Sequence, residues 1–90
     1  MEIRKQDALA DMEIHDTPSG ARNIFSIKFI KKDGELVYLP YAYSSGLRAD
    51  MKNNRLRGVT PCTSTGQATG HPYPVIIDNI IEYNNNIVIP

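Results

Sequence analysis

Cysteine and histidine are scarce in this sequence, which has one cysteine, two histidines and no tryptophan. Because Cys62 is alone, an intramolecular disulfide and a Cys-x-x-Cys motif are both excluded. His15 and His71 stand far apart along the chain, and zinc requires three or four ligands. We therefore expect no metal site, no cofactor and a reducing compartment.

Long apolar runs are also lacking. No stretch approaches the roughly 18 apolar residues of a membrane-spanning helix. Residues 1–11 mix charged with small side chains where a signal peptide would carry an apolar block. We expect a cytoplasmic protein without a membrane partner. The abundance of Ile, Asn, Lys and Tyr is typical of A+T-rich genomes, so an accessory protein of a phage or mobile element, with a virion-associated location, is a further hypothesis.

The composition is that of a folded domain. Of the 90 residues, 41% are hydrophobic and 22% are charged, near the averages for globular proteins. A chain of this length buries only roughly 60 to 65% of the surface that its unfolded form exposes. We therefore expect one domain over residues 1–90, with a small core.

The N-terminal residues carry the pattern of a short helix. Residues 4–13 are mostly good helix formers, and Ala8, Leu9 and Met12 share one face at helical spacing. A segment containing proline and glycine follows and favours a turn. The pattern predicts a helix and turn within residues 1–23.

Residues 24–43 show the clearest strand pattern, with two β-rich runs joined by Lys32-Asp33-Gly34. A two-residue turn would mix lysines with aliphatic side chains on one face. A three-residue loop with a left-handed Gly34 instead groups the apolar side chains and sets Lys31 opposite Glu35. We predict this second register. Its apolar face comprises Phe25, Ile27, Phe29, Val37, Leu39 and Tyr41.

The second half of the chain predicts a strand, a long loop and another hairpin. Residues 56–62 have the pattern of a short strand, and residues 63–74 have loop composition with two glycines and two prolines. The apolar run 75–83 leads into three asparagines, which tolerate the positive φ of tight hairpin turns. We expect a three-residue tip, with one face that comprises Ile81, Tyr83, Ile87 and Ile89.

These elements predict a mostly β fold, with α+β at the margin. Two hairpins and a middle strand are too few for a large sandwich. They suit a small, partly open barrel or roll of about five antiparallel strands, with a short N-terminal helix.

Charge is distributed unevenly, although the ten basic and ten acidic residues cancel. Residues 59–90 contain no lysine or arginine, while the basic segment 48–57 has four cations and one acid. Aromatic side chains beside cations are typical of surfaces that stack bases and neutralise phosphates. A nucleic-acid-binding module is therefore one hypothesis; its alternatives are contact with an acidic protein surface, or a solvated loop beside a core tyrosine. The candidate contact residues are Tyr41, Tyr43, Arg48, Lys52, Arg55 and Arg57.

The last hairpin is apolar on both of its predicted faces. Ile76, Ile80 and Val88 fall opposite the isoleucines that we expect to face the core. Either the N-terminal helix covers this second face, or the face and the C-terminal edge strand pair with another copy. Ile76, Ile80 and Val88 are therefore candidates for self-association.

Two side-chain pairs are candidates for catalysis. Cys62 and His71 lie on one loop, and Asp78 and Glu82 are four residues apart in a strand-like run. Neither pair comes with an orienting group or a phosphate-binding glycine motif, so we expect no enzyme activity and no small-molecule substrate. The leading hypothesis is a non-catalytic structural or protein-interaction module that docks through its last hairpin and long loops.

Overall fold

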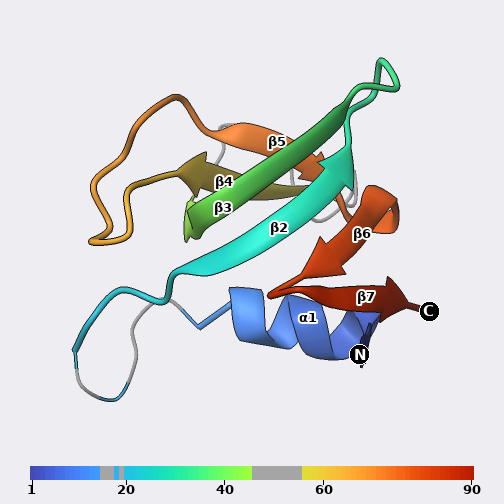
Figure 1. Ribbon diagram of the computed structural model, residues 1–90, viewed down its shortest axis with the longest axis horizontal. Coiled ribbons are helices and arrows are strands. Elements are labelled where there is room, and N and C mark those ends of the chain that lie inside the picture. The colour runs from blue at the N-terminus through green and yellow to red at the C-terminus, as the bar shows by residue number, and fades with distance from the viewer. Residues whose placement is uncertain (15–17, 19, 46–55) are drawn as a thin grey trace.

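The computed structural model describes residues 1–14, 18, 20–45 and 56–90, and the strands in these segments form one mixed sheet (Figure 1). The elements in chain order are β1 (Glu2–Arg4), α1 (Lys5–Met12), β2 (Phe25–Ile30), β3 (Leu36–Ser45), β4 (Leu56–Pro61), β5 (Tyr73–Ile76), the 3₁₀ turn η1 (Ile77–Asn79), β6 (Ile80–Tyr83) and β7 (Asn86–Ile89). The strand order across the sheet is β1-β7-β6-β2-β3-β4-β5. The predicted mostly β fold with a short N-terminal helix is confirmed, and the sheet has seven strands where about five were expected.

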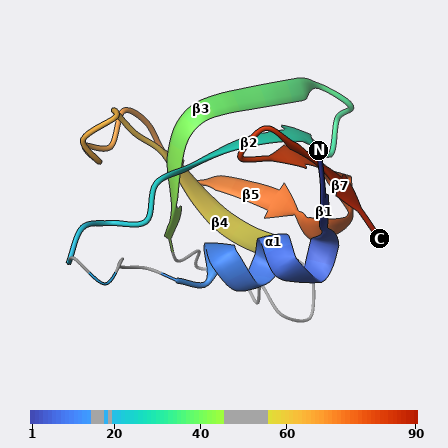
Figure 2. The ribbon, with the colours of Figure 1, turned by 60° about the horizontal axis from the view of Figure 1, so that its bottom comes forward.

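The sheet rolls up without closing, because β3 is long and bends over the core. Figure 2 shows β3 turning from the upper layer down toward β4, with α1 lying across the opposite side. The roll brings β5 near β2, where the Phe29 and Tyr73 rings meet edge to face with centroids 5.9 Å apart. The core inside the roll comprises Ala8, Met12, Phe25, Ile27, Phe29, Leu39, Ala42, Val59, Val75, Ile80 and Tyr83.

The register of the first hairpin is the predicted one. Phe29 pairs with Val37 and Ile27 with Leu39, and the backbone N–H of Lys31 donates to the Glu35 carbonyl at 2.8 Å. The loop is therefore three residues long, and its last residue, Gly34, has φ +92°. The expected cross-strand ion pair is also present, with 3.5 Å between Lys31 Nζ and a Glu35 carboxylate oxygen.

One residue of this hairpin, Tyr41, lies on the opposite face of the sheet from the face that was predicted. Between Phe25 and Ile27 the register shifts, so that Phe25 pairs with Ala42 and one β2 residue opposes both Pro40 and Tyr41. Such a bulge breaks the alternation of side chains along a strand. Ala42 therefore enters the core, and Tyr41, which was expected on the apolar inner face, is 46% exposed.

The last hairpin differs from its prediction in two respects. The run 75–83 is not one strand, because η1 interrupts it between β5 and β6. The tip is a two-residue turn of Asn84 and Asn85, not the predicted three-residue tip, and Tyr83 pairs with Asn86. Both turn residues have positive φ, 50° and 65°, as expected of asparagine in a tight hairpin.

The helix α1 lies where the sequence predicted it and closes one side of the core. Ala8 and Met12 are buried, and Leu9 packs against the same cluster. The Asn23 Nδ2 donates to the carbonyl oxygens of Asp11 and Ile14, at 2.9 and 3.0 Å, which fixes the end of the helix against the start of β2.

The buried phenol of Tyr83 links this helix to the sheet. Its hydroxyl donates to the Asp11 carboxylate, and its ring lies 5.0 Å from the Phe25 ring between centroids. Burial raises the pKa of Tyr83 far above its ordinary value, and the hydrogen bond and the negative charge of Asp11 raise this pKa further. The fold therefore favours the protonated phenol.

This raised pKa makes the free energy of unfolding depend on pH in a defined direction. The contribution is complete below the unfolded pKa of tyrosine, about 10, and is lost as the pH rises above it, because the unfolded chain releases the proton first. Tyr83→Phe removes the titrating group, so above about pH 10 the stability difference between the two proteins should shrink by up to about 1.4 kcal/mol per pH unit. Urea unfolding at several pH values measures this difference; parallel pH profiles for the two proteins would contradict the assignment.

Candidate docking surface

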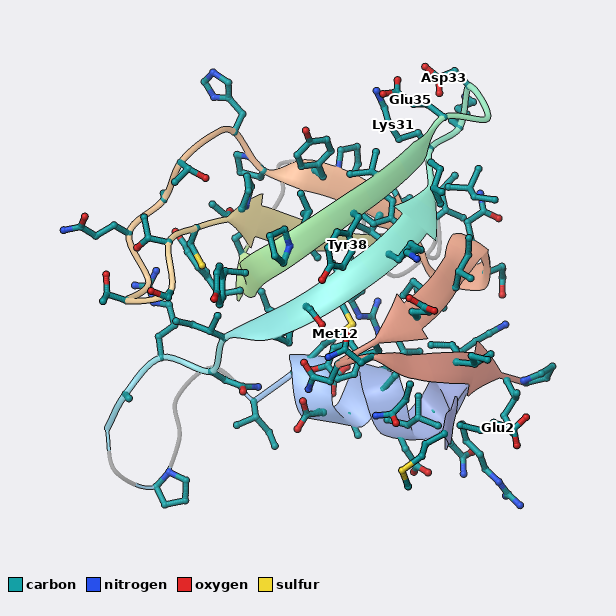
Figure 3. All side chains as sticks on the ribbon, viewed as in Figure 1. Glu2, Met12, Lys31, Asp33, Glu35 and Tyr38 are labelled. Atoms are coloured by element: carbon teal, nitrogen blue, oxygen red, sulfur yellow. The ribbon has the colours of Figure 1, made fainter. Side chains whose placement is uncertain are left out.

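A row of paired side chains crosses the outer face of the sheet. The register places Tyr38 beside Lys28, Lys28 beside Glu82 and Glu82 beside Ile87. Lys28 Nζ lies 3.1 Å from a Glu82 carboxylate oxygen and 5.7 Å from the centre of the Tyr38 ring. Tyr38 projects from the face that Figure 3 presents to the reader. The charges in the middle of this row are thus neutralised within the sheet.

The outer face of β3 exposes an apolar stripe at the end of this row. Leu36, Tyr38 and Tyr41 are 57%, 51% and 46% exposed, and Pro40 is also exposed. We call Leu36, Tyr38, Pro40 and Tyr41 the β3 stripe. Solvent-facing positions of a sheet are ordinarily polar, so a row of large apolar side chains there is a candidate contact surface.

The two tyrosines of the stripe border an open hollow of about 510 Å³, which we call the tyrosine hollow. Four segments distant in sequence contribute to it: the start of β2, the middle of β3, the loop after β4 and the turn between β6 and β7. Its lining residues are Ile24, Phe25, Ser26, Tyr38, Pro40, Tyr41, Ser64, Asn84 and Asn85. All of these side chains are uncharged.

The walls of the tyrosine hollow are held by backbone hydrogen bonds. The Asn84 N–H donates to the Ser26 carbonyl, and the Ser26 N–H donates to the Asn84 side-chain oxygen at 3.0 Å, which fixes the β6–β7 turn beside β2. The Cys62 N–H donates to the Tyr41 carbonyl, and the next residue, Thr63, bonds Gln67 across a short turn. The predicted loop 63–74 therefore folds back on itself and brings Ser64 to the hollow, and its last two residues belong to β5.

Several polar groups on the rim have no protein partner among the described residues. The Asn84 side-chain oxygen is occupied by Ser26, which leaves its Nδ2 as a donor. In the described part of the chain no hydrogen bond engages this Nδ2, the amide of Asn85 or the hydroxyls of Tyr38 and Tyr41. The hollow thus combines two exposed aromatic rings with uncharged donors that have no hydrogen-bond partner among the described residues.

The candidate nucleic-acid contacts do not gather at one described surface. Arg48, Lys52 and Arg55 lie outside the described residues. Arg57 donates to its neighbour's carbonyl and forms an ion pair with Glu13, 3.4 Å between Nη2 and the carboxylate. The half-buried Tyr43 ring is covered by Arg22, whose guanidinium carbon lies 4.1 Å from the ring centre. Tyr41 alone of the six is placed on the exposed stripe.

The structure places the three self-association candidates mostly inside. Ile80 is 6% exposed in the core, Val88 packs against the core, and Ile76 is half-buried. The two-faced alternation fails because η1 changes the direction of the chain between β5 and β6. The C-terminal strand is also not an edge, because β1 pairs with β7 in parallel and takes that place.

In the two pairs considered for catalysis, the cysteine is buried and both carboxylates form ion pairs with lysines. Cys62 is buried, and this burial raises the pKa of its thiol, which disfavours the nucleophilic thiolate. Asp78 bonds Lys5 at 3.1 Å, whereas Glu82 bonds Lys28. Within the described segments no group of three or more His, Cys, Asp or Glu side chains is placed to hold a metal ion.

No known protein family, curated protein or solved structure matches the chain. A separate finding concerns membranes: the helical segments of the described residues lack the length and hydropathy needed to cross one. The function is therefore argued from the surface itself. Sequence reasoning did not single out Tyr38, Asn84 and Asn85, which line the hollow. The available signals were that the predicted register puts Tyr38 on the outer face of its strand, and that the asparagines lie at a hairpin tip.

Proposed function

We propose that the protein is a non-catalytic interaction module that holds a segment of a partner protein in the tyrosine hollow. The observation that carries this proposal is the pair of exposed rings, Tyr38 and Tyr41, beside uncharged hydrogen-bond donors that have no partner among the described residues. Tyrosine is enriched in protein interfaces because its ring gives a large contact area at a small cost in side-chain entropy, and its hydroxyl bonds the partner. In this proposal the last hairpin contributes only its tip, Asn84 and Asn85, to the contact surface.

The shape of the hollow supports a peptide segment over a small molecule. Small-molecule sites are concave and bury most of the ligand. The tyrosine hollow is open and spans four chain segments on a sheet face. The exposed apolar side chains at its border continue along the β3 stripe to Leu36, so the apolar surface is elongated along β3.

The charge of the hollow favours a protein segment over a nucleic acid. A nucleic-acid surface needs cations beside its aromatic rings to neutralise phosphates. None of the residues that line the hollow is charged, and Lys28 beside Tyr38 is already paired with Glu82. Nucleic-acid binding through the basic segment 48–57 is therefore an outcome of the test below.

Selection from a displayed peptide library tests the proposal. The wild-type protein serves as bait, with Tyr38→Thr/Tyr41→Thr as the counter-bait, since threonine keeps the β propensity of each site. The matched control is Ile87→Ser, which removes an apolar side chain that is 51% exposed on the same sheet face but outside the hollow. We expect peptides that bind the wild type and Ile87→Ser and are lost on the double variant.

Two results would overturn the proposal. The first is that no peptide is enriched, or that the same peptides bind the double variant. The second is tight, salt-sensitive binding of single-stranded oligonucleotides that is lost in Arg48→Ala/Lys52→Ala/Arg55→Ala, because phosphate contacts lose affinity steeply with salt. Arg57 is left unchanged in that variant, since its ion pair with Glu13 ties β4 to the end of the helix.

A further inference from the structure

We infer that the partner segment adds to the sheet as a β-strand along Leu36–Pro40 of β3, an inference that rests on the proposed function and names the conformation and chemistry of the segment. β3 pairs with β4 only at Ala42–Ser45, where it bends down toward that strand (Figure 2). Its earlier residues pair with β2 on one side, and no strand of the described segments pairs with them on the other. We call Leu36–Pro40 the open edge of β3. A free backbone edge is what an extended peptide needs to join a sheet.

The register shows which main-chain groups of the open edge are free. The N–H of Lys31 bonds the carbonyl of Glu35, and in an antiparallel ladder every second residue pair is hydrogen-bonded. Val37 therefore directs its N–H and carbonyl toward β2. Its two neighbours, Leu36 and Tyr38, direct theirs away from β2, and no hydrogen bond joins these groups to another described residue. The open edge thus presents donors and acceptors in the alternation that an added strand pairs with.

The side chains beside the open edge define the chemistry of the segment. Leu36 and Tyr38 are 57% and 51% exposed on the outer face. Side chains directly opposite one another on paired strands have Cβ atoms about 4.5 to 5.5 Å apart, so apolar residues at alternate positions of the segment would cover these two. The charge of Lys28, on the neighbouring strand β2, is already paired with Glu82. An uncharged segment with alternating apolar residues is therefore the partner that fits.

The open edge leads into the tyrosine hollow. Pro40 ends the edge and lines the hollow together with Tyr41 and with Ser64, which follows β4. Because proline has no N–H, the main-chain donors of the edge stop at Tyr38. A segment paired along the edge would continue into the hollow, with its first part held by backbone hydrogen bonds and its next part by the tyrosine rings.

A second copy of this chain does not suit the open edge. β4 lies on the same side of β3 as the edge, and the N–H of Cys62 at its end bonds the Tyr41 carbonyl. If two copies paired antiparallel with Leu36 opposite Tyr38, Tyr41 of one copy would lie level with Asp33 of the other. Cys62 would then meet the hairpin loop of that other copy. A free extended segment brings no such neighbouring strand with it.

The test is a titration of ¹⁵N-labelled protein with the heptapeptide acetyl-Thr-Val-Thr-Val-Thr-Val-Thr-amide, followed by two-dimensional amide spectra. We expect saturable shifts of the Leu36 and Tyr38 amides that exceed the shift of Val37, whose N–H already faces β2, with a dissociation constant of roughly millimolar order. N-methylation of one alternate set of peptide residues should abolish these shifts. Methylation of the other set should keep the dissociation constant within about threefold, because only every second N–H of an added strand faces the sheet.

Two variants test the same bonds on the protein. Leu36→Pro removes the N–H that points away from β2, and proline is tolerated in a strand where its nitrogen faces solvent. Leu36→Ala is the matched control, since it shortens the same side chain and keeps the N–H. We expect Leu36→Pro to bind the heptapeptide at least about fivefold more weakly than Leu36→Ala, which corresponds to about one hydrogen bond. Unchanged amide shifts in β2 verify that the proline variant is folded; if it is not, the methylated peptides decide.

The inference fails on any of three results. These are no shift at the open edge with millimolar heptapeptide, equal effects of the two methylated sets, or a dimer in which the Leu36 and Tyr38 amides are protected without peptide, which would assign the edge to a second copy. If peptides from the library selection need both tyrosines of the hollow but tolerate N-methylation at every position, the proposed function stands and this inference alone fails. If the selection yields no peptide and the heptapeptide causes no shift, both fail.

Discussion

Replacing Phe29 with alanine is expected to lower the free energy of unfolding by about 3 to 5 kcal/mol. Phe29 is completely buried in β2, where it pairs with Val37 on one side and Ile80 on the other. Its ring also meets Tyr73 across the roll, so the deletion opens a cavity where the edge strand β5 approaches the central strand β2. Small domains have a total stability of only about 5 to 15 kcal/mol, so much of the population would unfold at raised temperature.

Urea unfolding followed by circular dichroism measures this loss. The matched control is Leu36→Ala, which removes an apolar side chain that is 57% exposed on the neighbouring strand, and should cost less than about 1 kcal/mol. Similar losses for the two variants would mean that the roll does not bury Phe29 as described.

Replacing Met12 with alanine is expected to cost about 2 to 5 kcal/mol and to release the helix from the sheet. The helix α1 has eight residues, and Arg4 at its start makes no side-chain capping bond. A helix this short does not persist in water without tertiary packing. Met12 is fully buried against the core, so its side chain supplies a large share of that packing.

Amide hydrogen exchange separates this effect from a general loss of stability. In Met12→Ala, we expect the amides at 9–13 to lose more protection than those of β2 and β3. Gln6→Ala, on the exposed side of the same helix, should change stability by less than about 0.5 kcal/mol. Uniform loss of protection across the chain in Met12→Ala would argue that α1 and the sheet unfold as one unit.

Local sequence patterns correctly predicted the loop length and the register at the tip of the first hairpin. Only the three-residue loop both gives Gly34 the positive φ that glycine tolerates and places Phe29 opposite Val37. The helical spacing of Ala8 and Met12 likewise identified the buried face of α1. In each case the deciding interactions lie within about ten residues of one another.

Features set by contacts distant in sequence were missed. β1 is only three residues long and forms by parallel pairing with β7, at the other end of the chain, so no local pattern marks it. The bulge opposite Ser26 lies next to Ala42, where the pairing of β3 with β4 begins, and it places Tyr41 on the surface where the sequence predicted the core.

The candidate site shows the same division. The sequence predicted Tyr41 as a candidate contact residue together with the basic segment, whereas the fold places it in the hollow beside Tyr38 and the asparagine turn. The partners of Tyr41 come from chain positions about twenty and forty residues away, and only the sheet order brings them together. The self-association candidates Ile76, Ile80 and Val88 do not form one exposed face for a related reason, because η1 breaks the alternation from which that face was predicted.

The most direct test of docking at the tyrosine hollow is calorimetric titration of a peptide recovered by the library selection into four proteins: the wild type, Tyr38→Thr, Tyr41→Thr and Ile87→Ser. We predict that each tyrosine variant weakens binding by about tenfold or more, while Ile87→Ser stays within about twofold of the wild type. The contrary result, with Ile87→Ser as damaging as the tyrosine variants or with all four proteins binding alike, would place the contact elsewhere on the molecule and contradict the proposed function.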